Sequence, residues 1–268
     1  MLIENLLVAI TFHYDETRLG YLKEVCEQIP NLGFKYEFLI ITNIQEQSLI
    51  AKIRDQLWPL KNYGVISYPT MGHPYFLTWG HLPIFRSRLS DKAGYTHFMY
   101  LEDDIKVTPQ NIAYWLRGRY ELRNYGFYPS FVRYEDNYLD KNSYSTDITE
   151  QLRFTKLPHL FITTNYAYLN SPQQYQGMYL MDREMMIEYF NSAASSPDFG
   201  SWNIREKATQ GLTFLNVPKY FFSRNLIGCN LSLKMIDVGS LIKHLPGNYA
   251  NNPQSTFGKI PIKNLIRF

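Results

Sequence analysis

This chain of 268 residues has little cysteine, little net charge and no long hydrophobic run. Its two cysteines, Cys26 and Cys229, give neither a disulfide framework nor a metal-binding spacing, which predicts a reducing, cytoplasmic setting. The 27 basic and 24 acidic side chains leave a net charge of +3, so no nucleic-acid partner is expected. The apolar run Leu6–Phe12 is far too short to span a bilayer, and Glu4 before it is not typical of a signal peptide.

Several motifs that mark other enzyme classes are absent as well. The chain contains no G-x-G-x-x-G, no G-x-x-x-x-G-K-[ST], no H-E-x-x-H and no G-x-S-x-G. These absences argue against a dinucleotide-binding enzyme and a zinc protease, and they exclude a P-loop and the nucleophile elbow of a serine hydrolase.

The first hundred residues alternate between strand-length apolar runs and stretches with helical spacing. Leucine and other apolar residues recur at three- and four-residue intervals over about 19–29, 49–57 and 82–89, which predicts three helices. Strand, helix, strand in this order predicts an α/β fold with a mostly parallel central sheet flanked by helices. The expected strands are Leu6–Phe12, Phe34–Thr42, Tyr63–Tyr68 and His97–Leu101.

The second half of the chain is less regular and predicts a smaller, mixed part. Strands are expected over 127–134, 177–181 and about 213–222, and helices over 183–191 and 204–209. The tail from His244 onward is rich in Pro, Asn and Gly and is expected to wrap over the surface. Within it, 259–268 mixes lysine and arginine with isoleucine and leucine, which fits either a packed strand or a weak peripheral contact with an anionic membrane.

Three consecutive acids, Glu102, Asp103 and Asp104, follow the strand that ends at Leu101. A parallel sheet binds its ligands beyond the carboxyl ends of its strands, where this turn lies. Adjacent carboxylates repel unless a positive charge lies among them, and oxygen ligands favour Mg, Ca or Mn, with an added imidazole favouring Mn. A metal here would bridge the protein to a diphosphate. The alternative is a solvated acidic turn before the next helix.

The pattern resembles a GT-A glycosyltransferase in four features that follow one another along most of the chain. They are Thr11-Phe12-His13 at the end of the first strand, Tyr100-Leu101-Glu102-Asp103-Asp104 as a variant of the D-x-D motif, an acid within Trp202-Asn203-Ile204-Arg205-Glu206-Lys207, and His244 in Lys243-His244-Leu245-Pro246. The resemblance implies one GT-A-like, Rossmann-related domain over 1–268. Residues 1–120 would form its nucleotide-sugar half and 121–268 its acceptor half.

The resemblance also implies roles for individual residues. Asp104 and His244 would hold Mn²⁺ or Mg²⁺. Glu102 would touch the ribose or a metal-bound water, and Asp103 between them would belong to the same cofactor-binding turn.

Glu206, between Arg205 and Lys207, would be the base, with Asp198 as its rival; surface charge and turn formation are their ordinary explanations.

Three more residues are candidates for contact with the donor. Thr11 and Asn43 end the first two strands and could bind the base or ribose, or simply form turns. Gly177 would lie against the donor sugar, although a strand bulge explains this glycine too.

The activity that the resemblance implies is metal-dependent, hexosyltransferase-like glycosyl transfer, inverting in outcome. The sugar would pass from a nucleotide-sugar donor, with UDP-sugars favoured, to a hydroxyl of a carbohydrate, lipid-linked or protein acceptor. Two alternatives stay open. A nucleotidyltransferase would need a basic, glycine-rich loop near the N-terminus, which 12–20 lacks. A non-catalytic carbohydrate-binding protein would need neither metal nor nucleotide.

Overall fold

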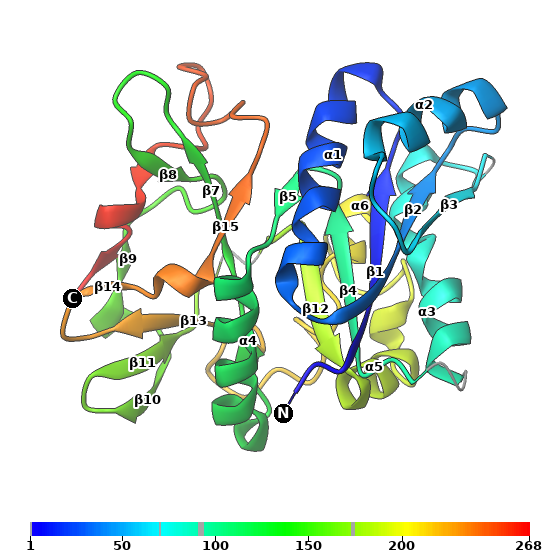
Figure 1. The fold of residues 1–268 in the computed structure, drawn as a ribbon. Helices are drawn as coiled ribbons and strands as arrows, with labels where there is room; N and C mark the ends of the chain where they lie inside the picture. The colour runs from blue at the N-terminus through cyan, green and yellow to red at the C-terminus, as the bar shows by residue number, and fades with distance from the viewer. Residues whose placement is uncertain (1, 70, 91–93, 173–174) are drawn as a thin grey trace. The chain divides into compact units, whose positions relative to one another are not determined.

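The computed structural model describes residues 2–69, 71–90, 94–172 and 175–268 (Figure 1). The chain forms two compact units, each assembled from separate segments. The parallel-sheet unit comprises residues 2–105 and 177–212, and the mixed-sheet unit comprises 106–176 and 213–268. The expected division into donor and acceptor halves near residue 120 concerns function and stays a prediction.

A five-stranded sheet with the order β12-β4-β1-β2-β3 forms the centre of the parallel-sheet unit. Strands β4, β1, β2 and β3 are mutually parallel, and β12 runs antiparallel to β4. Every residue of β1 is buried, as expected of a strand covered on both faces. This confirms the α/β class. The strands are β1 (Asn5–Phe12), β2 (Lys35–Thr42), β3 (Tyr63–Ser67), β4 (His97–Glu102) and β12 (Met178–Asp182).

Helices connect these strands and cover the sheet. In α1, the apolar stripe expected from the sequence (Leu19, Leu22, Val25 and Cys26) is buried. After β3 the chain returns past β1 to form β4, so right-handed crossovers place α1 and α2 on one face and α3 on the other. The helices are α1 (Leu19–Gln28), α2 (Gln47–Leu57), α3 (His81–Ser90), α5 (Arg183–Phe190) and α6 (Ile204–Ala208), with 3₁₀ turns η1 (Glu16–Arg18), η2 (Pro30–Leu32), η3 (Pro74–Trp79) and η6 (Ala193–Ser195).

The mixed-sheet unit packs helix α4 (Pro109–Leu122) with short strands. Thr108 and Asn111 form a capping box at the start of α4, and Pro109 takes the first helical position, as expected. The strands are β6 (Tyr128–Pro129), β7 (Val132–Asp136), β8 (Ser143–Ser145), β9 (Leu152–Arg153), β10 (His159–Thr163), β11 (Tyr166–Leu169), β13 (Asn225–Asn230), β14 (Met235–Ile236), β15 (Leu241–His244), β16 (Ile260–Pro261) and β17 (Ile266–Arg267); the 3₁₀ turns are η4 (Arg123–Tyr125), η5 (Phe154–Lys156), η7 (Val238–Ser240) and η8 (Ile262–Asn264). The two-residue strand β5 (Ile105–Lys106) ends one unit and begins the other.

Two expected strands of the second half differ from the structure. The segment 213–222 forms turns, and the strand lies later, at β13. Left-handed backbone at Asn216 and Tyr220 interrupts the extended conformation that the apolar side chains predict. The strand expected over 127–134 is split into β6 and β7, with residues 130–131 outside both.

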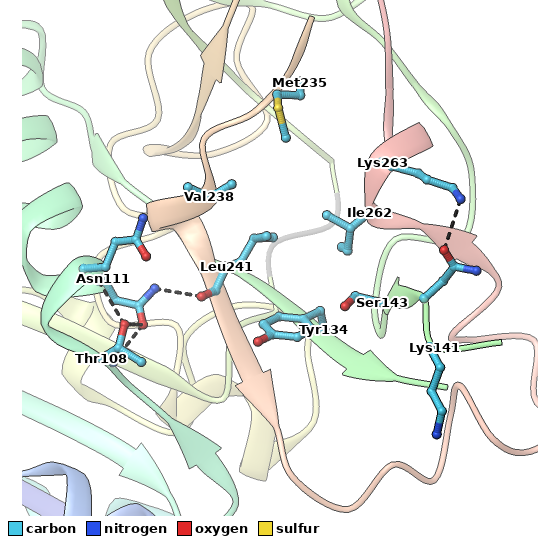
Figure 2. A pocket seen from close by; sticks show the side chains of 12 residues that line it. Thr108, Asn111, Tyr134, Lys141, Ser143, Met235, Val238, Leu241, Ile262 and Lys263 are labelled. Carbon is cyan, nitrogen blue, oxygen red and sulfur yellow. Dashed lines mark hydrogen bonds between the residues drawn. The ribbon is translucent and has the colours of Figure 1, made fainter. Parts of the chain in front are cut away.

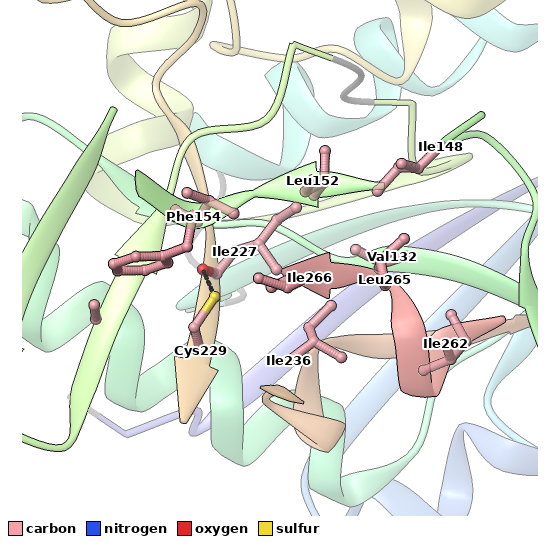
Figure 3. Close-up of a cluster of buried hydrophobic side chains, with 12 residues drawn as sticks. Val132, Ile148, Leu152, Phe154, Ile227, Cys229, Ile236, Ile262, Leu265 and Ile266 are labelled. Carbon is pink, nitrogen blue, oxygen red and sulfur yellow. Dashed lines mark hydrogen bonds between the residues drawn. The ribbon is translucent and has the colours of Figure 1, made fainter. Parts of the chain in front are cut away.

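The C-terminal tail belongs to the core of the mixed-sheet unit (Figure 3). Ile262, Leu265 and Ile266 are buried in a cluster with side chains from other segments, such as Ile227 and Ile236. Strand β17 also pairs in parallel with β9. The packed alternative for the tail is therefore right, and these apolar side chains are not available for insertion into lipid. Among the described residues, no helix combines the length and apolar character needed to cross a membrane.

Candidate functional site

The acidic turn lies where the strand order of the parallel sheet reverses. β4 and β1 are neighbours, and Glu102 pairs in register with Thr11. The chain moves outward from β1 to β3 and then returns to the opposite side of β1, so the carboxyl ends of β1 and β4 form a topological switch point. Asp103 and Asp104 follow directly and are only 6% and 5% exposed. The sequence therefore places its three acids at the usual ligand-binding position of such a sheet.

Arg18 binds both buried carboxylates of this turn. Its Nε donates to Asp103 Oδ2 at 2.9 Å, and its Nη2 donates to Asp103 Oδ1 at 2.9 Å and to Asp104 Oδ2 at 2.7 Å. Arg18 lies on η1, the turn after β1, which Asp15 caps by accepting from Thr17 N. Arg18 is not among the site residues predicted from the sequence. A basic side chain within a few residues of the end of β1 was the available signal, because β1 and β4 end at the same edge.

Burial and charge act against each other in this cluster. Burial raises the pKa of Asp103, Arg18 opposes that shift, and the carboxylates of Asp104 and Glu102 add to it. Burial lowers the pKa of Arg18, but its bonds to Asp103 and Asp104 outweigh burial and raise that pKa overall. The guanidinium therefore stays charged and provides positive charge that the acidic turn requires.

Glu102, Asp103 and Asp104 offer the hard oxygen donors that Mg²⁺ and Mn²⁺ prefer. However, Arg18 already engages both oxygens of Asp103 and one of Asp104. Among the described residues, no group of three or more His, Cys, Asp or Glu side chains is arranged to hold a metal ion. The donor chemistry fits a divalent ion, but binding through Asp104 Oδ2 would require that oxygen to exchange its bond with Arg18.

His244 lies in the mixed-sheet unit, in a buried pair with Glu135. The sequence predicts a loop at His244, but this residue is the last of β15 and only 5% exposed. Its Nδ1 lies 2.6 Å from Glu135 Oε1, and Glu135 Oε2 accepts from Tyr249 N and Ala250 N at 2.8 and 2.7 Å. Donation from Nδ1 would leave Nε2 as the acceptor of a neutral ring, which is the usual arrangement of a metal-bound histidine. Joint metal binding by Asp104 and His244 stays a prediction.

Gly177 lies against the acidic turn. Its φ of +65° is left-handed, and a Cβ there would lie 3.0 Å from both Glu102 Oε2 and Ile105 Cγ1. Glu102 N also donates to Gly177 O at 3.0 Å. Close backbone approach therefore does require glycine, although the groups that approach are those of the acidic turn itself.

Glu206 lies on α6 in the parallel-sheet unit and is partly buried. Its Oε1 lies 3.2 Å from Arg205 Nη2, whereas Lys207 donates to Pro197 O instead. Its Oε2 is buried and has no hydrogen bond among the described residues. A carboxylate held by one cation, with its other oxygen unbonded, has the acceptor that a general base needs.

Helix α6 lies close to the strand that carries the acids. Trp79 Nε1 of η3 donates to Ile204 O at 2.8 Å, which anchors α6. Burial raises the pKa of Tyr100 on β4; Glu102 adds to this shift and Arg205 opposes it. Tyr100 thus interacts electrostatically with both the acidic turn and α6.

The structure gives structural partners to two of the remaining candidates. Asp198 is exposed in a turn, where its N donates to Ser196 Oγ at 3.2 Å. Asn43 Oδ1 accepts from Tyr14 N at 2.8 Å and so ties the loops after β1 and β2 together. These contacts match the turn-forming alternatives. Thr11 is 6% exposed near the carboxyl end of β1, beside Glu102.

The mixed-sheet unit contains a second candidate site, a pocket of about 480 Å³ (Figure 2). This volume lies within the range of small-molecule sites, roughly 300–1,000 Å³. Leu241 and Ile262 contribute apolar surface, while Lys141 and Lys263 contribute cations. Lys263 Nζ donates to Asn142 Oδ1 at 3.1 Å. The pocket therefore suits a small ligand with both apolar and polar parts.

Comparisons with known proteins identify distant structural likenesses. No family model and no curated protein matches the chain. Among solved structures, a fragment of S. aureus TarS matches with a TM-score of 0.41 and 12% identity over 77% of this chain, which spans 56% of that one. The 4-diphosphocytidyl-2C-methyl-D-erythritol synthase of Anaerococcus prevotii DSM 20548 matches with a TM-score of 0.37 and 10% identity, over 76% of this chain and 81% of that one. At these scores the likeness extends to neither family nor activity.

Proposed function

We propose that the protein is a glycosyltransferase that moves a sugar from a nucleotide-sugar donor, with UDP-sugars favoured, to an acceptor hydroxyl. The acidic turn at the switch point of the parallel sheet carries this proposal. Such a position receives the nucleotide in open α/β sheets, and the turn combines three carboxylates with the guanidinium of Arg18.

The donor would bind across the carboxyl ends of β1 and β4. Thr11 and Glu102 would face the ribose, with Asp103 and Arg18 fixing the turn. A bound Mn²⁺ or Mg²⁺, held by Asp104 with His244 as the predicted second ligand, would neutralise the negative charge of the departing diphosphate. Arg18 carries a positive charge at the same place, and its guanidinium suits phosphate oxygens as well as carboxylates.

Glu206 is the proposed base, with Asp198 as the alternative. The acceptor oxygen attacks the anomeric carbon, and its proton passes to Glu206 Oε2. The bond from that carbon to the diphosphate oxygen breaks, and the diphosphate leaves with the electron pair. Attack from the opposite face inverts the anomeric configuration.

The acceptor is proposed to be a carbohydrate, a lipid-linked sugar or a protein, and the setting cytoplasmic. The mixed-sheet pocket is a place where part of an acceptor could bind, because it offers apolar surface beside two lysines.

Thermal unfolding with UDP, GDP, CMP and ADP, each with and without Mn²⁺, tests the proposal. We expect stabilisation by one nucleotide that is greater with the metal. Asp104→Asn should abolish the metal-dependent part while the protein still unfolds cooperatively. Asp140→Asn is the matched control, since Asp140 is an exposed acid that accepts from Asn142 N in the other unit. A flat response to all four nucleotides would contradict the proposal and favour a non-catalytic carbohydrate-binding protein.

A further inference from the structure

An anchored loop of the mixed-sheet unit, residues 213–224, presents aromatic side chains to solvent. Arg224 N donates to Thr213 O at 2.9 Å, which closes the loop at its base. The ring of Phe221 packs on Phe127 with 4.5 Å between centroids, and Phe222 N donates to Asn170 Oδ1. The loop is therefore a compact, fixed structure rather than a loose connection.

Tyr220, near the tip of this loop, combines unfavourable backbone with an exposed ring. Its φ is +74°, a conformation that costs an ordinary side chain about 1–2 kcal/mol. Because Tyr220 is 79% exposed, burial of its ring does not offset this free-energy cost. Lys219 Nζ lies 4.9 Å from the centre of the ring, and the nearby Phe222 is 48% exposed. The loop thus exposes aromatic rings and a cation to solvent, and packing of the Tyr220 side chain does not stabilise the fold.

The end of helix α4 and the turn η4 after it also carry exposed aromatic and basic side chains. Tyr120 and Tyr125 are 65% and 57% exposed, and the guanidinium of Arg123 lies 5.7 Å from the Tyr120 ring centre. This segment is joined to the loop because Arg224 Nε donates to Gly126 O at 2.8 Å. We call the exposed aromatic and basic side chains of these two joined segments the aromatic-basic patch: Tyr120, Arg123, Tyr125, Lys219, Tyr220 and Phe222.

The charge of the patch has one sign. The loop 213–224 contains no acidic residue, and the segment 117–128 contains one, Glu121. Glu121 Oε2 accepts from Tyr168 OH at 2.7 Å. Arg123 and Lys219 offer positive charges, which anionic headgroups can pair with and a neutral glycan cannot. Tyrosine and phenylalanine beside lysine and arginine match the headgroup level of a bilayer, where rings and cations both find partners.

We infer that the aromatic-basic patch docks the protein on a bilayer that contains anionic lipids. The rings lie at headgroup level, and Arg123 and Lys219 lie beside the anionic headgroups. This replaces the C-terminal tail, whose apolar side chains are buried, as the membrane-contacting surface. The docking requires neither nucleotide binding nor glycosyl transfer, so it can be tested independently of the proposed activity.

Co-sedimentation with vesicles tests the inference. The full chain should bind vesicles of phosphatidylcholine with phosphatidylglycerol, bind phosphatidylcholine alone weakly, and be released by high salt. Lys219→Ala should weaken partitioning about fivefold, the share of one basic residue at an anionic surface. Tyr220→Asn should also weaken binding, while its melting temperature stays equal or rises, because asparagine tolerates left-handed backbone.

The control for these variants is the exposed turn after β13. Leu233 there is 67% exposed, and its neighbour Lys234 has a φ of +52°. The double variant Leu233→Ser, Lys234→Ala removes an apolar side chain and a cation outside the patch, and should bind as wild type. No binding to the anionic vesicles would overturn the inference. So would binding that both patch variants leave unchanged, an equal loss in the control, or capture on a glycan array without binding to vesicles.

Discussion

Replacing Arg18 with methionine tests the electrostatics of the acidic turn directly. The variant keeps an unbranched apolar stem but removes three hydrogen bonds from Asp103 and Asp104, whose side chains are 9% and 7% exposed. Removing one partner from a fully buried ion pair costs about 3–5 kcal/mol. The Arg18 side chain is 32% exposed, so solvent screens part of this interaction, and we expect a loss of about 2–3 kcal/mol in unfolding free energy.

Urea denaturation of four proteins measures this effect. Lys52→Met is the matched control, because Lys52 bonds Glu16 at 2.9 Å but both side chains are largely exposed, at 49% and 68%. Solvent screens such an exposed pair, so its loss should change the unfolding free energy little. The double variant Arg18→Met, Asp103→Asn should recover part of the loss, since it removes one of the stranded charges. If a divalent ion can take the place of the guanidinium, Mn²⁺ should stabilise Arg18→Met more than wild type.

The reasoning would be refuted if Arg18→Met unfolded within about 0.5 kcal/mol of wild type, the usual range of a surface substitution. An equal loss in Lys52→Met would refute it as well, because burial would then not distinguish the two cations.

Three further predictions concern the same unit. Gly177→Ala should lower the unfolding free energy by about 1–2 kcal/mol because of the left-handed backbone, and by more because its Cβ would lie 3.0 Å from neighbouring atoms. Gly33 has a φ of +83° and open space around it, so Gly33→Ala should show only the loss due to the backbone conformation in the same urea titration. His81 is fully buried and its pKa is lowered to about 3 by burial, so its contribution to stability is present above pH 6.5 and is lost as the pH falls toward 3. Between pH 7 and pH 5 the unfolding free energy of wild type should fall by about 2 kcal/mol on account of His81, and His81→Leu should not show this part of the fall. The same pH dependence of unfolding free energy in both proteins would contradict the burial of a neutral ring. Glu206→Gln should keep nucleotide binding but lower the transfer rate by roughly two to four orders of magnitude, measured as glycosylated acceptor formed per unit time. Retained transfer would contradict the role of Glu206 and favour Asp198 as the base.

The regular part of the fold could be predicted because local patterns and burial agree there. Apolar runs such as Leu6–Phe12 became buried strands, and the helical stripe beginning at Leu19 became the buried face of α1. The prediction was wrong over 213–222, where apolar residues at the surface imitate a strand. Hydrophobicity reports burial only on average, and left-handed backbone at Asn216 and Tyr220 has no strong signal in the sequence.

The candidate site was predictable in position but not in its contacts. The acids at 102–104 could be placed at the carboxyl end of a strand, because the alternation of strands and helices predicts a mostly parallel sheet whose ligands bind at that edge. Their bonds to Arg18 span 85 and 86 residues in the sequence and depend on which strands are neighbours. The pairing of His244 with Glu135 depends likewise on contacts between distant segments, over 109 residues.

The way the chain enters and leaves the parallel-sheet unit has a consequence for its synthesis. Strand β12 lies beside β4 at one edge of that sheet, yet more than seventy residues separate the two in sequence. These include the whole segment 106–176 of the other unit. Until β12 leaves the ribosome, β4 would present an unpaired, apolar edge to solvent. Expression of 1–105 alone should therefore give insoluble material. A shortened chain in which 105 is linked to 177 by a flexible spacer should be the smallest piece that yields a soluble sheet.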